Sequence, residues 1–185
     1  MALNFGSRVP VTGNFEFIGK GVTASGASID NAGGYTASQT NQMINGANHI
    51  PKVWHDGAEF SGAFKDFSIS INNGLRPQDK VGSADLAGVG VGRFNMSGTA
   101  NPYFEDLSLY NKFINNQYNE LVYLIDDDST TAIGNVYVLT MPRVKFTTME
   151  VPATAADTDI MQPLSWQATQ DSTTGATLVI ERIPQ

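Results

Sequence analysis

Hydrophobic and polar residues alternate in several short segments of the chain. The clearest are residues 67–71, with the sequence FSISI, and residues 93–105, in which Phe94, Met96, Ala100, Pro102 and Phe104 share one phase. Successive side chains of a β-strand point to opposite faces, so this alternation predicts strands with one buried face. Proline cannot donate a ladder hydrogen bond, so Pro102 predicts an edge or a bulge at that end of the second strand.

Other segments predict further strands. Residues 14–18 alternate through Phe15 and Phe17, which indicates a short strand. Residues 121–125 and 136–139 are apolar on both faces, as in central strands, and Pro142 separates the second from a strand through residues 144–148. Residues 164–168 and 178–180, joined by a polar turn at 171–175, predict a C-terminal hairpin.

One helix is predicted after residue 105. Asp106 can cap it, Leu107, Tyr110 and Ile114 form an apolar stripe with Phe113 beside it, and residues 115–116 (NN) end it. The fold class is therefore mainly β: a β-sandwich or barrel of about eight strands with one flanking α-helix and a long N-terminal arm or loop. The expected core contains Phe67, Ile69, Ile71, Phe94, Met96, Tyr123, Val138, Trp166 and Ile180.

Residues 21–62 have an unusual composition. Between Lys20 and Lys52 the only charged residue is Asp30, and most side chains are small and polar. Such a segment lacks the apolar area to offset its ordering entropy, so we expect it to pack on a neighbouring subunit; the alternative is a long surface loop. We divide the chain into an N-terminal strand and arm, residues 1–62, and a β-sandwich domain, residues 63–185. The expected arm contacts are Ser25, Asp30, Tyr35, Gln39, Met43 and Asn48.

The charge of the chain limits its partners. It has 11 basic and 18 acidic residues, a formal net charge of −7, and only 16% of its residues are charged, against ~25% in a typical soluble domain. This balance argues against a protein that grips nucleic acid, but it does not exclude one that DNA slides past. Low charge suits surfaces that neighbouring molecules cover. The chain has no cysteine, and therefore no disulfide or thiolate metal site.

Candidate chemistry is sparse. His55 and Asp56 are adjacent, and neighbours on an extended chain point to opposite sides, so a loop hydrogen bond is favoured over an oriented base. The glycines of residues 88–92 (GVGVG) lead into a strand rather than a helix, which indicates close backbone packing and not a phosphate loop. Residues 126–128 (DDD) lack the glycine and the closing glutamate of a calcium loop. We predict no enzyme, no catalytic or metal-binding residue, and no cofactor.

The order of several segments resembles a known family. They are residues 67–76 (FSISINNGLR), 94–98 (FNMSG), 103–106 (YFED), 109–113 (LYNKF), 139–144 (LTMPRV), 159–161 (DIM) and 165–168 (SWQA). Together they resemble the major tail tube proteins of long-tailed bacteriophages with non-contractile tails. The resemblance covers residues 64–183.

The resemblance implies a structural virion protein. Such proteins form hexameric rings in which each subunit lends strands to one barrel around a lumen. The rings stack head to tail, bridged by long loops and terminal arms, and DNA leaves the head through the lumen without specific binding. The implied partners are further copies of the chain and other tail proteins, such as the tape measure protein and the tail terminator, with no membrane. The implied location is the virion tail, assembled in the cytoplasm of the bacterial host.

We expect the polar phases of the two alternating strands to face this lumen; the alternative is that they form the solvent face of a sandwich. A wall poor in Lys and Arg would not retain phosphates. Nine of these ten residues are neutral or acidic, and the exception, Arg93, lies near a strand end. The ten are Asp66, Ser68, Ser70, Asn72, Arg93, Asn95, Ser97, Thr99, Asn101 and Glu105.

Two other functions remain open at this point. One is a different component on the same fold, such as a tail terminator or the tube subunit of a contractile tail or secretion system. The other is a carbohydrate-binding β-sandwich. A lectin displays aromatic side chains outward, whereas the two tryptophans here are Trp54 and Trp166, and Trp166 occupies a core-facing position.

Overall fold

A computed structural model describes residues 1–21, 43–47, 49, 52–60, 62–126, 135–152 and 157–184. These residues form twelve β-strands and one α-helix, which confirms the mainly-β class with one helix but exceeds the predicted strand number of about eight. In chain order the elements are β1 (Ala2–Gly6), β2 (Thr12–Asn14), β3 (Lys52–His55), β4 (Ala58–Glu59), β5 (Phe64–Asn72), β6 (Arg76–Gln78), β7 (Gly88–Gly90), β8 (Asn95–Pro102), α1 (Ser108–Ile114), β9 (Tyr118–Asp126), β10 (Asn135–Met149), β11 (Leu164–Ala168) and β12 (Val179–Pro184).

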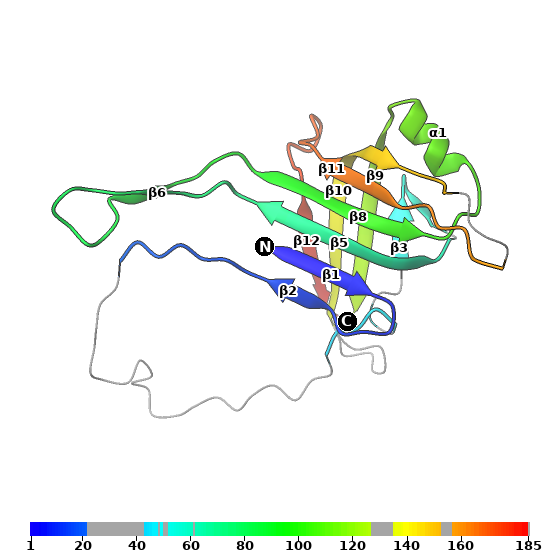
Figure 1. The fold of residues 1–185 in the computed structure, drawn as a ribbon, viewed down its shortest axis with the longest axis horizontal. Coiled ribbons are helices and arrows are strands. Elements are labelled where there is room, and N and C mark those ends of the chain that lie inside the picture. The colour runs from blue at the N-terminus through cyan, green and yellow to red at the C-terminus, as the bar shows by residue number, and fades with distance from the viewer. Residues whose placement is uncertain are drawn as a thin grey trace.

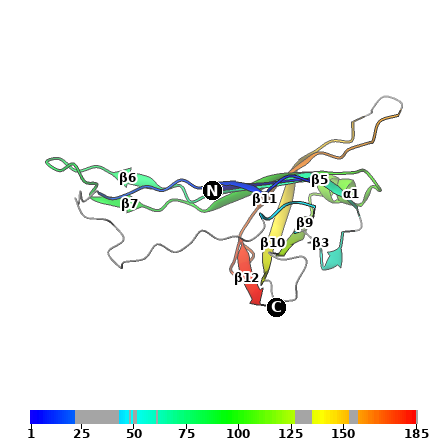
Figure 2. The same cartoon turned by 90° about the horizontal axis from the view of Figure 1, so that it is seen from below.

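Ten of the strands belong to one antiparallel sheet. Their order is β2-β1-β5-β8-β11-β10-β9-β3-β4, and β12 pairs with β10. The sheet bends so that β1, β5, β8 and β11 form one layer, while β9, β12, β3 and most of β10 run across it (Figures 1 and 2). The result is a sandwich made from a single folded sheet, with the core between its two layers.

Strand β10 belongs to both layers. Its first half pairs with β12 and its second half with β11, on the same side, while β9 occupies the other side. Register irregularities between Met141 and Val144, and between Phe146 and Thr148, let it bend. Two predictions are therefore wrong. Pro142 lies at a bulge inside one continuous strand, and β11 and β12 pair with β10 rather than with each other.

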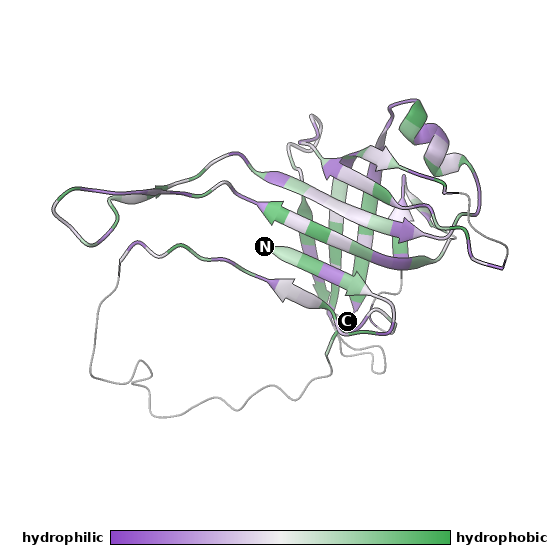
Figure 3. Cartoon of the chain, in the orientation of Figure 1, coloured by the Kyte–Doolittle hydropathy of each residue, from purple (hydrophilic) through white to green (hydrophobic). Residues whose placement is uncertain are grey.

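Aromatic rings join the two layers. The ring of Phe67 stacks on Phe5 at a centroid distance of 4.3 Å and on Tyr123 at 4.5 Å. Alternating colours along β5 and β8 in Figure 3 show the two-faced pattern that directs such residues inward. Burial raises the pKa of Tyr123 far above its ordinary value.

Most of the predicted core is confirmed. Phe67, Ile69, Met96, Tyr123 and Trp166 are buried. Ile71 and Val138 are partly buried.

Two predicted core residues are exposed in the single chain. Phe94 is 41% exposed, because it precedes β8 at the base of a hairpin. Ile180 is 60% exposed, because it lies on β12, which pairs with β10 alone among the strands that the structure describes.

Gly98 makes room for the largest core side chain. It lies on β8 directly opposite Trp166 of β11 and Ile69 of β5. A Cβ atom at this position would collide with the Ser68 carbonyl oxygen and with the indole ring of Trp166. The glycine therefore leaves room for the indole ring of Trp166, which is 1% exposed.

A long hairpin projects from the sandwich between β5 and β8 (Figure 1). The sequence predicted a polar loop here, and the structure adds the short strands β6 and β7. At its base the two backbones approach closely, since a Cβ atom on Gly92 would lie 2.5 Å from the Gly74 carbonyl oxygen. This close approach confirms the expected role of the last glycine in GVGVG.

Helix α1 buries only part of the predicted apolar stripe. Tyr110 and Phe113 pack against the core, as predicted, together with the buried Leu109. Leu107 and Ile114 are instead 54% and 59% exposed.

The predicted cap is wrong, because Leu107 is the N-cap and no side-chain hydrogen bond caps the helix. Asp106 accepts a hydrogen bond from the Ser108 N–H at 2.7 Å, and hydrogen bonds from the side chain and the backbone of Ser108 lower the pKa of Asp106. The helix ends at Ile114, and Asn115 of the predicted NN end is its C-cap.

The N-terminal residues join the main sheet. β1 pairs with β5, and β2 extends the sheet outward from β1. The predicted strand at residues 14–18 is wrong for the single chain: β2 ends at Asn14, and Phe15, Phe17 and Ile18 are 54%, 88% and 41% exposed. Of the predicted arm contacts, Met43 is 75% exposed, and Ser25, Asp30, Tyr35, Gln39 and Asn48 lie outside the described residues. The predicted extent of the arm, residues 21–62, is wrong at its end, because residues 52–59 form β3 and β4 and β3 pairs with β9 of the same chain.

Replacing Ile69 with alanine should lower the free energy of unfolding by about 2–5 kcal/mol, because it leaves a cavity between the layers. The matched control is Ile180→Ala, which removes the same atoms at an exposed position and should cost less than about 0.5 kcal/mol. Denaturant unfolding of the unassembled protein measures both. Equal losses in the two variants would contradict the described core.

Candidate assembly surfaces

The outer face of β5 and β8 carries a ladder of small polar side chains. The register places Asp66 opposite Asn101, Ser68 opposite Thr99, Ser70 opposite Ser97, and Asn72 opposite Asn95. Eight of the predicted lumen residues therefore come together on one face, in directly opposed pairs. Glu105 lies beyond β8, before α1, and Arg93 precedes β8 at the base of the hairpin.

The same face continues onto the neighbouring strands. Pairing places Ala2 and Asn4 of β1 beside Ser70 and Ser68, and Ser165 and Gln167 of β11 beside Thr99 and Ser97. The alternation in residues 164–168 was visible in the sequence, but its alignment with β8 required the sheet order. One lateral row crosses six strands through Thr12, Asn4, Ser68, Thr99, Ser165 and Thr148.

Side chains on this face bond to one another across the strands. The hydroxyls of Ser68 and Thr99 are 2.8 Å apart, and Asn101 Nδ2 donates to Asp66 Oδ1 at 2.5 Å. Gln167 Nε2 donates to Asn95 Oδ1 at 2.9 Å. Among the side chains that β1, β5 from Asp66 onward, β8 and β11 direct to this face, Asp66 alone is charged. We call this surface, on β1, β5, β8 and β11, the polar face.

Basic side chains gather at one border of the polar face. Lys145 of β10 lies directly opposite Gln167 and Tyr118 in the ladder. The guanidinium of Arg143 lies 3.9 Å from the centroid of the Tyr118 ring, and Lys145 Nζ lies 5.5 Å from it. Tyr118 is 48% exposed, and neither cation forms an ion pair with a described carboxylate.

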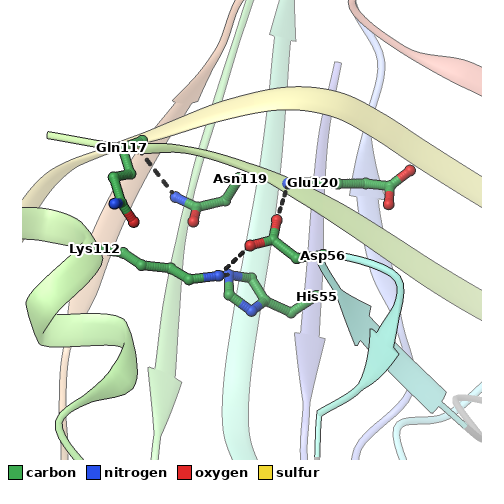
Figure 4. A network of polar contacts seen from close by, with 6 residues as sticks. All are labelled: His55, Asp56, Lys112, Gln117, Asn119 and Glu120. Carbon is green, nitrogen blue, oxygen red and sulfur yellow. Dashed lines mark hydrogen bonds and ion pairs between the residues drawn. The ribbon is translucent and has the colours of Figure 1, made fainter.

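A second polar cluster fastens the β3–β4 hairpin to α1 and β9 (Figure 4). Asp56 and Gly57 form the turn with φ of 50° and 75°, the left-handed pair of a two-residue hairpin. Because the chain reverses here, the side chains of Asp56 and His55 both lie close to Lys112. Lys112 of α1 forms an ion pair with Asp56 and lies 3.4 Å from His55 Nε2. Asp56 Oδ1 also accepts a hydrogen bond from the Glu120 N–H at 2.8 Å.

The prediction that His55 and Asp56 point to opposite sides is therefore wrong, because the chain turns at Asp56. The pKa of His55 is lowered by burial of its ring and by the charge of Lys112, against smaller opposing effects of Asp56 and Asn119. Burial raises the pKa of Asp56, but the bonds from Lys112 and Glu120 outweigh it and hold the pKa below its ordinary value. These contacts indicate a structural role: they hold the β3–β4 hairpin against α1 and β9, with His55 neutral and Asp56 charged.

The comparisons with known proteins agree with an assembly protein. The chain matches the family model described as phage tail tube protein over residues 1–168. It therefore belongs to the phage tail tube protein family, and is a structural component of the virion tail. No curated protein sequence matches it.

The family match extends the resemblance of residues 64–183 to the N-terminal residues, and stops before β12. Membership of this family argues against the alternative of a carbohydrate-binding β-sandwich. Within the described residues, no helix is long and apolar enough to cross a membrane.

The free energy of unfolding should fall as the pH decreases from 7.5 to 5.5, in part because of His55. Its folded-state pKa lies below the unfolded value of about 6.5, so protons bind the unfolded chain first. The contribution of His55 is complete above pH ~6.5 and is lost below it. His55→Gln should reduce the fall. Lys112→Met should reduce it partly, because burial, the larger cause of the lowered pKa of His55, remains, and only the charge of Lys112 is removed. Denaturant titrations at both pH values test this, and an undiminished fall in His55→Gln would contradict it.

Proposed function

We propose that this chain is the subunit of the tube of a non-contractile phage tail. Subunits form hexameric rings, the rings stack into a tube, and DNA passes through the lumen during ejection. The polar face lines that lumen. Its continuity over β1, β5, β8 and β11, with Asp66 as its one charged residue, is the observation that carries the proposal.

Electrostatics favour such a wall. Each phosphate neutralised by Lys or Arg releases a counterion and adds affinity, so a basic lumen would retain DNA. Many hydroxyls and amides of this face already bond to one another, such as Ser68 with Thr99 and Gln167 with Asn95. They therefore have fewer free donors for the oxygens of a phosphate. The wall therefore contacts water and DNA without holding either strongly.

The projecting hairpin is suited to contacts between rings. It extends from the sandwich along the direction of β5 and β8, and Val81 near its end is fully exposed (Figure 1). Its Leu86 N–H donates to the Lys20 carbonyl oxygen at 2.9 Å, which ties it to the segment that leads into the arm. In the proposed tube the hairpin and the part of the arm that precedes β3 bridge to neighbouring subunits, whereas residues 52–59 belong to the sheet of their own chain.

Negative-stain microscopy of the purified chain should show rings or tubes, because the proposed contacts join two different surfaces of identical subunits and can therefore repeat. The matched variant lacks residues 25–48 and should remain folded, with the circular dichroism of a β protein, while it fails to polymerise. Normal tubes from the deletion would contradict the role of the arm. Monodisperse monomers of the intact chain, at concentrations where tube proteins assemble, would contradict the proposed function.

Replacing Ser68, Ser70, Ser97 and Thr99 with lysine should block tube assembly or slow DNA ejection. In a lumen the four new charges of each subunit repel those of its neighbours, and salt should relieve the block in assembly because it screens charges beyond ~8–10 Å. The same four positions changed to glutamine control for bulk and for the lost Ser68–Thr99 hydrogen bond. Wild-type assembly and ejection of the lysine variant, measured together, would show that these strands face solvent instead.

A further inference from the structure

A polar groove lies at the end of the polar face from which the long hairpin projects. Its volume is about 480 Å³, and it runs between the start of β8 and the chain that follows β11. Phe94 and Leu178 form an apolar part of its lining, whereas the polar part includes Arg93, Asn95, Gln167, Thr169 and Gln170. Asn95 and Gln167 also belong to the polar face, so the groove is continuous with that face. A groove lined in this way suits a ligand that is itself polar.

Three basic residues border this groove. Arg93 lines it directly. Arg143 is the neighbour of Thr169, whose N–H donates to the Arg143 carbonyl oxygen at 2.8 Å. Lys145 lies opposite Gln167 in the pairing of β10 with β11. None of the three cations forms an ion pair with a carboxylate in the part of the chain that the structure describes. One end of the polar face is therefore basic, although the chain as a whole carries a net charge of −7.

The aromatic ring of Tyr118 holds two of these cations at the surface. The guanidinium carbon of Arg143 lies 3.9 Å from the centroid of this ring, and Lys145 Nζ lies 5.5 Å from it. A guanidinium that lies over a ring keeps the N–H groups of its edge free, and this planar fork matches two oxygens of one phosphate. Because the ring already orders the side chain, less conformational entropy is lost when an anion binds. The contact therefore prepares Arg143 for an anionic ligand.

Two carboxylates lie near these cations without forming an ion pair with them. Glu120 is two residues from Tyr118 along β9, and Asp171 is in the turn after β11. Hydrogen bonds from Thr174 are the main cause of the lowered pKa of Asp171, and the charge of Arg143 is the smallest. Asp171 Oδ2 accepts hydrogen bonds within its own turn, from the N–H groups of Thr173 and Thr174 and from the Thr174 hydroxyl. The row of residues that crosses the polar face from Lys145 contains no acidic residue; it runs through Gln167, Ser97 and Ser70 to Ala2.

We propose that this groove and its three bordering cations bind the phosphates of a DNA backbone. We call the groove lining together with Arg93, Arg143 and Lys145 the basic groove. Arg143 and Lys145 approach the backbone from β10, and Arg93 approaches it from the base of the hairpin, two strand spacings or about 10 Å away. Contacts of this kind position a backbone and carry no sequence information.

The position of the basic groove favours DNA over an acidic polypeptide as its ligand. The groove is continuous with the polar face, which lines the lumen in the proposed tube, so this step rests on the proposed function. DNA carries one negative charge per ~1.7 Å of its axis, and a phosphate therefore stays within reach of the groove while the DNA slides. One belt of basic grooves in each ring retards and centres the passing DNA, and the rest of the wall stays non-adhesive.

The affinity for DNA tests the basic groove directly. Fluorescence anisotropy of a short labelled duplex, added before assembly, measures it over ~20–200 mM NaCl, and the affinity of the wild type should fall steeply with salt. Arg143→Gln with Lys145→Gln should weaken binding at low salt by at least about tenfold, and each lost cation should reduce the salt slope by about 1. The matched control is Arg8→Gln with Lys65→Gln, which removes the same two charges at exposed positions, at the end of β5 far from the groove. The control should bind within about twofold of the wild type.

Two further measurements separate a positioned site from general charge attraction. Tyr118→Leu keeps the cations but removes the ring that orders two of them, and should weaken binding by about threefold. An unchanged affinity would contradict the ordering role of the ring. Polyglutamate is the probe for an acidic polypeptide, and the wild type should bind it at least about tenfold more weakly than DNA.

Equal binding of DNA by the wild type and by Arg143→Gln with Lys145→Gln, or a preference for polyglutamate, would overturn the basic groove as a DNA site. If microscopy shows tubes in the same samples, the proposed function stands. A chain that forms neither rings nor tubes would overturn the proposed function. The basic groove is then tested on the unassembled subunit, where the NMR resonances of Arg93, Arg143 and Lys145 should shift when the duplex is added. Unmoved resonances would overturn the site itself.

Discussion

The ladder of hydrogen bonds along β10 is the constraint on which the rest of the structure depends. One strand of 15 residues pairs with β9 on one side and with both β11 and β12 on the other. The bulges near Pro142 and Thr147 bend it from one layer into the other. Through β11 it positions β8, β5 and β1, and through β9 it positions Tyr123 under Phe67. The two layers and their aromatic contact therefore follow from the course of a single strand.

The alternation of apolar and polar residues along the strands made part of this fold predictable. In β5 and β8 the apolar phase had to face the core, and Ile69 and Met96 are buried as expected. Tyr123 is buried too, as expected for β9, whose residues 121–125 are apolar on both faces. Partner choice was not predictable in the same way, because it depends on residues distant in the sequence. The turn at residues 171–175 indicated a hairpin, yet β10 is long enough to accept both β11 and β12. Pro142 indicated a break, but a bulge accommodates a residue without a donor. The burial of Leu109 in place of Leu107 shows the same limit for the helix, whose core-facing side is set by β10.

The candidate surface, too, could be predicted from the sequence only in part. The polar residues of β5 and β8 could be grouped from sequence, because both strands showed alternation, and the ladder sets them opposite each other in four pairs. Asn4, Ser165 and Gln167 could be added only when the order β1-β5-β8-β11 was known. The basic pair at Tyr118 depends on a bulge that no local pattern indicates. His55, Asp56 and Lys112 come together because a left-handed Asp-Gly turn reverses the chain, although the sequence DG is itself a hairpin signal.

The charges of the subunit acquire a consistent arrangement in the proposed ring. An isolated subunit presents Lys145 and Arg143 at the border of a face that is otherwise almost uncharged, and phosphates passing this border would meet unpaired cations. Stacking on Tyr118 holds the Arg143 guanidinium against this border. In the proposed tube DNA would therefore meet these two cations only at the edge of the wall, whereas the rest of the polar face presents hydroxyls and amides that bond to one another.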